Sequence, residues 1–134
     1  MIKFFDIYKQ DKKLSRNFIQ DFKKTIKKTN FINGDPVSNF ETKFSKFCGT
    51  KFTVACNSGS DALFFALKSL NLKKGSEVIL PAQTYCSTLF AVIRADLKPV
   101  LVDIQYTNPT ISFIELKKKI TKKTSAIILV HLYG

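Results

Sequence analysis

The stretch Asn57-Ser58-Gly59-Ser60-Asp61-Ala62-Leu63 lies where an apolar, strand-like run, Phe52–Cys56, meets a helix-like run. A turn of small residues between a strand and a helix leaves backbone N–H groups unpaired at the helix N-terminus, where the helix dipole is positive. Such a turn binds anions, most often a phosphate. Gly59 has no Cβ to block a ligand, and Ser58 and Ser60 add hydroxyl donors. The stretch therefore predicts an anion site between a strand and a helix.

A second interpretation of the same turn is a plain helix cap. Ser58 is followed three residues later by Asp61, which is a variant of the capping box with Asp in place of Glu or Gln. Taken alone, the turn is better explained as a cap, because short motifs recur often by chance. Both interpretations stay open on these residues.

The composition is that of a globular protein, with 134 residues of which 45% are hydrophobic and 24% charged. No apolar run approaches the ~20 residues of a membrane-spanning helix, and the N-terminus does not resemble a signal peptide. Cys48, Cys56 and Cys86 lack metal-site spacing and are expected to be buried thiols of a cytoplasmic protein. His131 lies in an apolar run and is expected in the core, as are many of the thirteen phenylalanines.

The formal net charge of +12 comes almost entirely from lysine, since only two of the 22 basic residues are arginine. Around residues 14–28 and 112–120 the lysines alternate with apolar residues at helical spacing, which places them on solvent-facing sides. A lysine-rich module that binds nucleic acid or an acidic surface is one hypothesis. The scattered lysines and the scarcity of arginine argue against it, so we expect neither nucleic acid nor membrane as a partner. The positive field favours an anionic small ligand.

The pattern changes character near residue 50. Before it, two amphipathic helices are expected, Leu14–Lys28 and Val37–Phe47, separated by Asn33-Gly34-Asp35-Pro36 and closed by a glycine cap at Gly49. After it, strands and helices alternate. The expected strands are Phe52–Cys56, Glu77–Leu80, Pro99–Val102 and Ala126–Leu132, and the expected helices are Ser60–Leu70, Thr84–Ala95 and Ser112–Ile120. We therefore expect an N-terminal helical segment, 1–50, and the first part of an α/β domain, 51–134.

Continuous apolar strands separated by helices predict a mainly parallel sheet covered on both faces, an α/β/α sandwich. Ligands of such sheets bind beyond the carboxyl ends of the strands. The turn at Ser60 and the turn at Tyr85 both fall there, so these two residues are expected to face one pocket. The chain stops at Gly134, directly after a strand-like run, which predicts the N-terminal portion of a longer protein with an unpaired apolar sheet edge.

Several segments in one order resemble the DegT/DnrJ/EryC1/StrS sugar aminotransferases, enzymes that use pyridoxal 5′-phosphate. The matching segments are Asn33–Glu41, Asn57–Leu63, Lys74–Tyr85, Lys98–Ile104, Ile120–Ile128 and Val130–Gly134. The resemblance covers essentially the whole chain, spacing included. It implies the large domain of a fold type I pyridoxal-phosphate enzyme, incomplete at its C-terminal side.

The resemblance implies roles for particular residues. The turn of Ser58, Gly59, Ser60 and Asp61 would bind the cofactor phosphate, with backbone N–H groups at Ser60 and Asp61; the family usually has Thr where this chain has Ser60. Tyr85 would stack on the pyridine ring, where a flat side chain gains burial and offset stacking; otherwise it is a core aromatic. The segment around Gly34 would lie near the active-site entrance and contact substrate, or be only a helix-breaking turn.

The resemblance also implies what these 134 residues lack. The family's Schiff-base lysine and the aspartate that pairs with the pyridine nitrogen follow the segment matching Val130–Gly134, and no lysine of this chain matches. Asp103 matches a different family aspartate and is expected to be structural. The chain alone is therefore expected not to transaminate.

The functional hypothesis is a cytoplasmic aminotransferase of amino-sugar biosynthesis, for a cell-surface polysaccharide or a secondary metabolite. It would transfer an amino group from a donor such as glutamate to a nucleotide-linked keto-sugar, as a homodimer when full length. The alternatives are a sugar dehydratase of the same fold and a non-catalytic truncated remnant.

Overall fold

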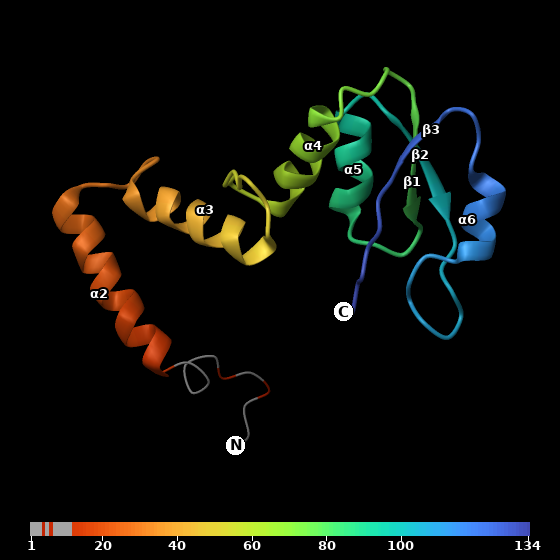
Figure 1. Ribbon diagram of the computed structural model, residues 1–134. Coiled ribbons are helices and arrows are strands. Elements are labelled where there is room, and N and C mark those ends of the chain that lie inside the picture. The colour runs from red at the N-terminus through yellow and green to blue at the C-terminus, as the bar shows by residue number, and fades with distance from the viewer. Residues whose placement is uncertain (1–3, 5, 7–11) are drawn as a thin grey trace. The chain divides into compact units, whose positions relative to one another are not determined.

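Two compact units, Met1–Ala55 and Cys56–Gly134, make up the chain in the computed structural model (Figure 1), which describes residues 4, 6 and 12–134. The first ten residues of the expected N-terminal segment thus fall largely outside the described part of the chain. The units are considered separately below.

The first unit holds helices α2, Lys12–Lys28, and α3, Asp35–Cys48. Pro36 stands in the first turn of α3, where its missing N–H costs nothing, and Gly49 closes the helix in the left-handed conformation with φ 67°. Both helices and the glycine cap confirm the sequence prediction to within two residues at each end.

The phenylalanines of this first unit stack on one another rather than forming a buried core. Phe18 and Phe22 stack with their ring centroids 6.2 Å apart, and Phe40 and Phe44 lie 5.3 Å apart. All four rings are exposed, and α3 has no buried residue. The expectation that many phenylalanines lie in the core is wrong for the described residues: the buried core is made of Leu, Val, Ile and Ala with Pro81, and only Phe64 packs partly buried against it.

The second unit is built around a three-stranded parallel sheet in the order β2-β1-β3. Its elements along the chain are α4 (Gly59–Ser69), β1 (Glu77–Pro81), α5 (Cys86–Arg94), β2 (Lys98–Val102), α6 (Phe113–Lys119) and β3 (Thr124–Ile127). The central strand β1 is buried along its whole length. Side chains alternate between the two faces of a strand, so β1 must be apolar on both sides.

Helices cover both faces of this sheet (Figure 1). On one face Val78 and Leu80 of β1 pack with Leu67 of α4 and Val92 of α5. On the other face Ile79 packs with Val102 and with Leu116 of α6. Each of these buried aliphatic side chains contributes about 1.5–3 kcal/mol of transfer free energy. The predicted parallel sheet with helices on both faces is thus confirmed.

Two strand predictions need correction. Phe52–Cys56 forms no strand, and Phe52 and Val54 are 75% and 84% exposed. A β-type sequence stays irregular when no partner strand pairs with it, since strand stability comes from cross-strand contacts. The strand expected over Ala126–Leu132 lies earlier, at Thr124–Ile127.

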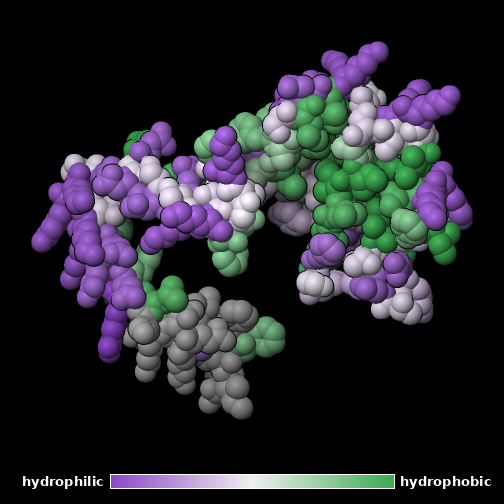
Figure 2. Space-filling model, viewed as in Figure 1, coloured by the Kyte–Doolittle hydropathy of each residue, from purple (hydrophilic) through white to green (hydrophobic). Residues whose placement is uncertain are grey.

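The expected burial of three cysteines and one histidine is also wrong. Cys48, Cys56, Cys86 and His131 are all exposed. Their apolar neighbours in the sequence do not lie in the core: Leu129 and Leu132, which flank His131, are themselves 61% and 36% exposed. Apolar surface shows over the second unit, and polar side chains cover α2, in Figure 2.

Candidate functional site

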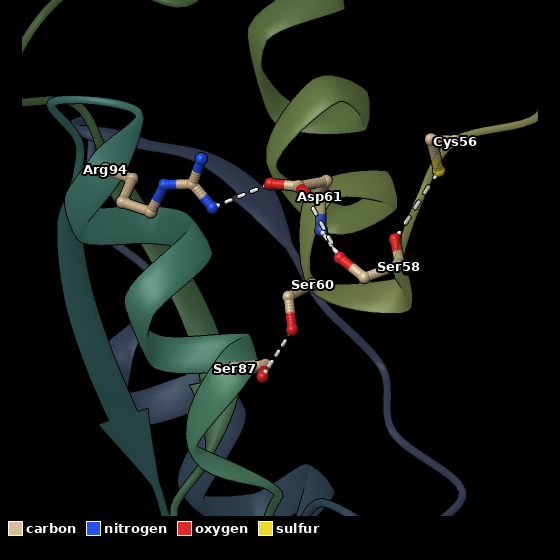
Figure 3. Close-up of polar contacts among 6 residues, drawn as sticks. All are labelled: Cys56, Ser58, Ser60, Asp61, Ser87 and Arg94. Carbon is tan, nitrogen blue, oxygen red and sulfur yellow. Dashed lines mark hydrogen bonds and ion pairs between the residues drawn. The ribbon is translucent and has the colours of Figure 1, made fainter.

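The first turn of α4 lies against α5, the helix that follows the central strand (Figure 3). Strand β1 ends at Pro81 and α5 begins at Cys86, so the start of α5 lies at the carboxyl end of the sheet. A hydrogen bond of 2.7 Å from Ser60 Oγ to Ser87 Oγ ties the start of α4 to the start of α5. The predicted turn therefore lies on the side of a parallel sheet where ligands bind.

Ser58 is the N-cap of α4, as the sequence indicated. Its backbone is extended, with φ −156° and ψ 157°, and its Oγ accepts a hydrogen bond from the Asp61 backbone N–H over 3.2 Å. Its hydroxyl donates to the Asp61 carboxylate over 3.1 Å, and the Cys56 thiol donates to its carbonyl oxygen over 3.4 Å. The capping interpretation is thus confirmed, and the cap holds the turn in one conformation.

The cap does not remove the turn's capacity to bind an anion. It occupies the Asp61 N–H, which the family resemblance had implied as a phosphate donor together with the Ser60 N–H. The amides of Gly59 and Ser60 precede the first intrahelical bond, from the Ala62 N–H to the Ser58 carbonyl. A Cβ placed on Gly59 would have nothing within 4 Å, so the space beside this backbone is open. A ligand with a phosphate group fits such a turn, since amides, helix dipole and open space coincide.

A cavity of about 300 Å³ adjoins this turn. It is lined by Ser60, Ser87, Phe90, Ala91, Ile93 and Arg94. Tyr85, which was expected to share a pocket with Ser60, does not line it. Instead Tyr85 is the N-cap residue of α5 and is 71% exposed, so its ring is open to a flat ligand.

The negative charge of the turn, on Asp61, is paired. Arg94 Nη1 donates to the Asp61 carboxylate over 2.9 Å, and the Arg94 guanidinium carbon lies 4.5 Å from the centroid of the Phe64 ring. The hydrogen bonds from Arg94 and then from Ser58 hold the pKa of Asp61 below its ordinary value, against a smaller desolvation effect. Asp61 is thus ionised at neutral pH.

Two other residues singled out in the sequence, Gly34 and Asp103, make contacts that shape the local backbone. Gly34 is the N-cap of α3 in the first unit, and a Cβ there would overlap the Asn30 side chain. Asp103 accepts a hydrogen bond from the Ile104 N–H over 2.8 Å, and its carbonyl accepts one from the Ser112 N–H over 2.9 Å. These contacts shape the loop after β2, in keeping with a structural role for Asp103.

Sequence reasoning missed Ser87 and Arg94. They lie seven residues apart, so both fall on one face of α5, two turns from each other. The signal was present in part, because Arg94 is one of only two arginines in a lysine-rich chain. Among the described residues no group of three His, Cys, Asp or Glu side chains could hold a metal ion. No helix in that part of the chain is long and apolar enough to cross a membrane.

Comparison with known proteins gives matches across the chain. Residues 12–134 match the profile of the DegT/DnrJ/EryC1/StrS aminotransferase family. The dTDP-3-amino-3,6-dideoxy-alpha-D-galactopyranose transaminase of Aneurinibacillus thermoaerophilus is 32% identical over 134 residues, which are 100% of this chain and 37% of that protein.

Solved structures agree with this match. The crystal structure of S. venezuelae DesV in complex with a ketimine intermediate superposes with a TM-score of 0.90 at 32% identity, over 99% of this chain and 36% of that one. The E. coli GDP-4-keto-6-deoxy-D-mannose-3-dehydratase with bound hydrated PLP gives a TM-score of 0.82 at 28% identity, over 99% and 33% of the two chains. The chain thus spans about a third of the length of these relatives.

Proposed function

This chain belongs to the DegT/DnrJ/EryC1/StrS aminotransferase family, and from that membership we propose that the protein carrying it is a pyridoxal-phosphate-dependent aminotransferase of nucleotide-linked keto-sugars. The dTDP-sugar transaminase from A. thermoaerophilus, matched over the entire chain, supports this substrate class. Glutamate is the proposed amino donor. A homodimeric state, a cytoplasmic location and the division at residue 50 belong to the same proposal.

The first turn of α4 carries this proposal. In it the amides of Gly59 and Ser60 precede the first intrahelical bond, the Ser58 cap holds the backbone, and the space where a Cβ of Gly59 would lie is open. The net charge of +12 also favours an anionic ligand. We assign the cofactor phosphate to this turn and the pyridine ring to the exposed face of Tyr85. When bound, pyridoxal phosphate supplies an electron sink for the carbon that exchanges its amino group. The residues of this chain bind and orient it.

Binding of pyridoxamine 5′-phosphate to the 134-residue chain tests this assignment. This form of the cofactor has no aldehyde, so it cannot react with surface lysines. Calorimetric titration should show binding that inorganic phosphate competes away, while pyridoxamine, which lacks the phosphate, binds much more weakly. Equal affinity for pyridoxamine and its phosphate would contradict a phosphate site in the turn.

We further propose that the lysine that bonds to the cofactor is not among these residues, as the family resemblance implies. The 134-residue chain should then release no 2-oxoglutarate from glutamate above the background of free cofactor. The protein that carries the chain should move ¹⁵N from labelled glutamate into a dTDP-linked keto-sugar, detected as a mass shift of the product. Turnover by the 134-residue chain alone would refute this part of the proposal.

A sugar dehydratase is the second candidate, because the E. coli 3-dehydratase superposes over 99% of the chain. The same labelling experiment separates the two. An aminotransferase gives a sugar that gains ¹⁵N, whereas a dehydratase gives a deoxygenated sugar without nitrogen. Conversion of a GDP-linked keto-sugar into a deoxygenated sugar without nitrogen would favour the dehydratase.

A further inference from the structure

An ionised carboxylate, Asp61, sits in the turn to which we assign a phosphate. Two negative charges a few ångströms apart repel each other, and the repulsion is stronger at a partly buried position than in bulk water. The Asp61 side chain is only 20% exposed. Unless its charge is offset, Asp61 should weaken the binding of an anion to its own helix N-terminus.

Arg94 provides the offsetting charge from the neighbouring helix. Its Nη1 lies 2.9 Å from a carboxylate oxygen of Asp61 (Figure 3). Its guanidinium carbon lies 4.5 Å from the centroid of the Phe64 ring. Residues 61 and 64 are three apart on one helix, so both contacts fall on one face of α4. These two contacts orient the guanidinium toward the carboxylate.

The Ser60–Ser87 bond fixes the same two helices at a second point. Ser87 lies two helical turns from Arg94 on α5, and each of these residues contacts the first turn of α4. The start of α4 is therefore attached to α5 both through a neutral hydrogen bond and through an ion pair. Only the ion pair changes the charge beside the proposed phosphate position.

Building on the proposed function, we propose that Arg94 is a positioning residue of the cofactor site: it neutralises and orients Asp61 so that the first turn of α4 accepts a phosphate. Arg94 acts through Asp61, not by contact with the phosphate. The Asp61 carboxylate bonds to the Ser58 cap, and the Arg94 charge allows that carboxylate to lie beside an anionic ligand.

A double-mutant cycle on the 134-residue chain tests this role, with the dissociation constant of pyridoxamine 5′-phosphate as the readout. Arg94→Ala should raise that constant about fivefold, because it leaves Asp61 uncompensated. Arg94→Lys keeps the charge but loses the planar guanidinium that lies over Phe64, so it should weaken binding less than Arg94→Ala does. In an Asp61→Asn background Arg94→Ala should have an effect of less than about twofold, since no negative charge remains to be offset.

Lys74→Ala is the matched control. It removes one positive charge and an exposed ion pair, 3.7 Å from Lys74 to Asp96, in the same unit. It should leave the dissociation constant unchanged. An equal effect of Lys74→Ala would show that only net charge matters, and would overturn the proposal.

The remaining outcomes separate the two proposals. A loss of affinity from Arg94→Ala that persists in the Asp61→Asn background means that Arg94 contacts the phosphate directly, which overturns this inference. Equal weakness of Arg94→Lys and Arg94→Ala overturns it too. Failure of the wild-type chain to bind pyridoxamine 5′-phosphate refutes the phosphate site itself, and this inference with it.

Discussion

At residue 59 the requirements of the helix and of the proposed ligand differ. Gly59 is the first residue of α4, has no left-handed backbone angle, and would place a Cβ in open space. Alanine therefore fits the folded protein there and costs less backbone entropy than glycine. In the proposed site, the space that a methyl group would fill is the space left for the anion beside the amides.

We predict that Gly59→Ala separates binding from stability. The free energy of unfolding in urea should stay equal or rise by up to about 1 kcal/mol, while the affinity for pyridoxamine 5′-phosphate falls. Ser58→Ala should instead lower the free energy of unfolding by about 1 kcal/mol, because it removes the cap. Undiminished cofactor affinity in Gly59→Ala would mean that the ligand does not approach this backbone.

The three contacts of this turn differ in whether a sequence pattern can reveal them. The Ser58 cap joins residues three apart, and its motif could be identified directly. The bonds Ser60–Ser87 and Asp61–Arg94 join residues 27 and 33 apart. Such pairs depend on how α4 packs on α5, which no local pattern specifies, so the partner of Asp61 could not be predicted.

At the scale of elements, Glu77 links the start of β1 to the start of β2 and to the segment that precedes β3. Glu77 is 7% exposed. Its carboxylate accepts hydrogen bonds from Lys98 Nζ of β2 over 3.1 Å and from the Thr121 hydroxyl over 2.8 Å. The bonds from Thr121 and then from Lys98 lower the pKa of Glu77 below its ordinary value of 4.5. Glu77 thus binds its proton less readily in the folded state than in the unfolded state.

We predict from this that Glu77 makes the second unit sensitive to acid. A lowered folded-state pKa gives stability that is fully present above about 4.5 and is lost as the pH falls through the folded-state pKa. Glu77→Gln should therefore unfold more easily at pH 7 and lose less stability between pH 5 and acid conditions, measured by urea unfolding at each pH. Glu115→Gln, which breaks an exposed pair with Lys118, is the control and should keep the wild-type pH profile. A Glu77→Gln profile that parallels the wild type would contradict the linkage.

Two apolar runs of similar character had different outcomes as predicted strands. The central strand, expected at Glu77–Leu80, is apolar on both sides and was found within one residue. Phe52–Cys56 has the same apolar character but no strand beside it, so its β-propensity goes unused. Propensity describes what a segment can form, while pairing decides what it does form.

At the scale of the whole chain, net charge and exposed apolar surface have opposite effects on the association of chains. The net charge of +12 favours separated chains, while residues such as Phe90, Leu101 and Ile127 leave large apolar side chains 54%, 49% and 42% exposed. The amount of exposed apolar surface could not be predicted from composition, because most of the described phenylalanines are exposed and only Phe64 among them packs partly buried against the core.

We predict that the 134-residue chain self-associates more strongly as salt rises. Raising the ionic strength from about 0.01 M to about 0.1 M shortens the Debye length from about 30 Å to about 10 Å, which weakens lysine repulsion while apolar attraction persists. Sedimentation velocity should therefore give a larger average sedimentation coefficient at the higher salt.

Ile127 lies on β3, at one edge of the sheet order, and a lysine on an edge strand opposes pairing between sheets. Ile127→Lys should accordingly reduce association at the higher salt. Association that weakens with salt would instead indicate ion pairs between chains, and association unaffected by Ile127→Lys would place the contact away from the β3 edge.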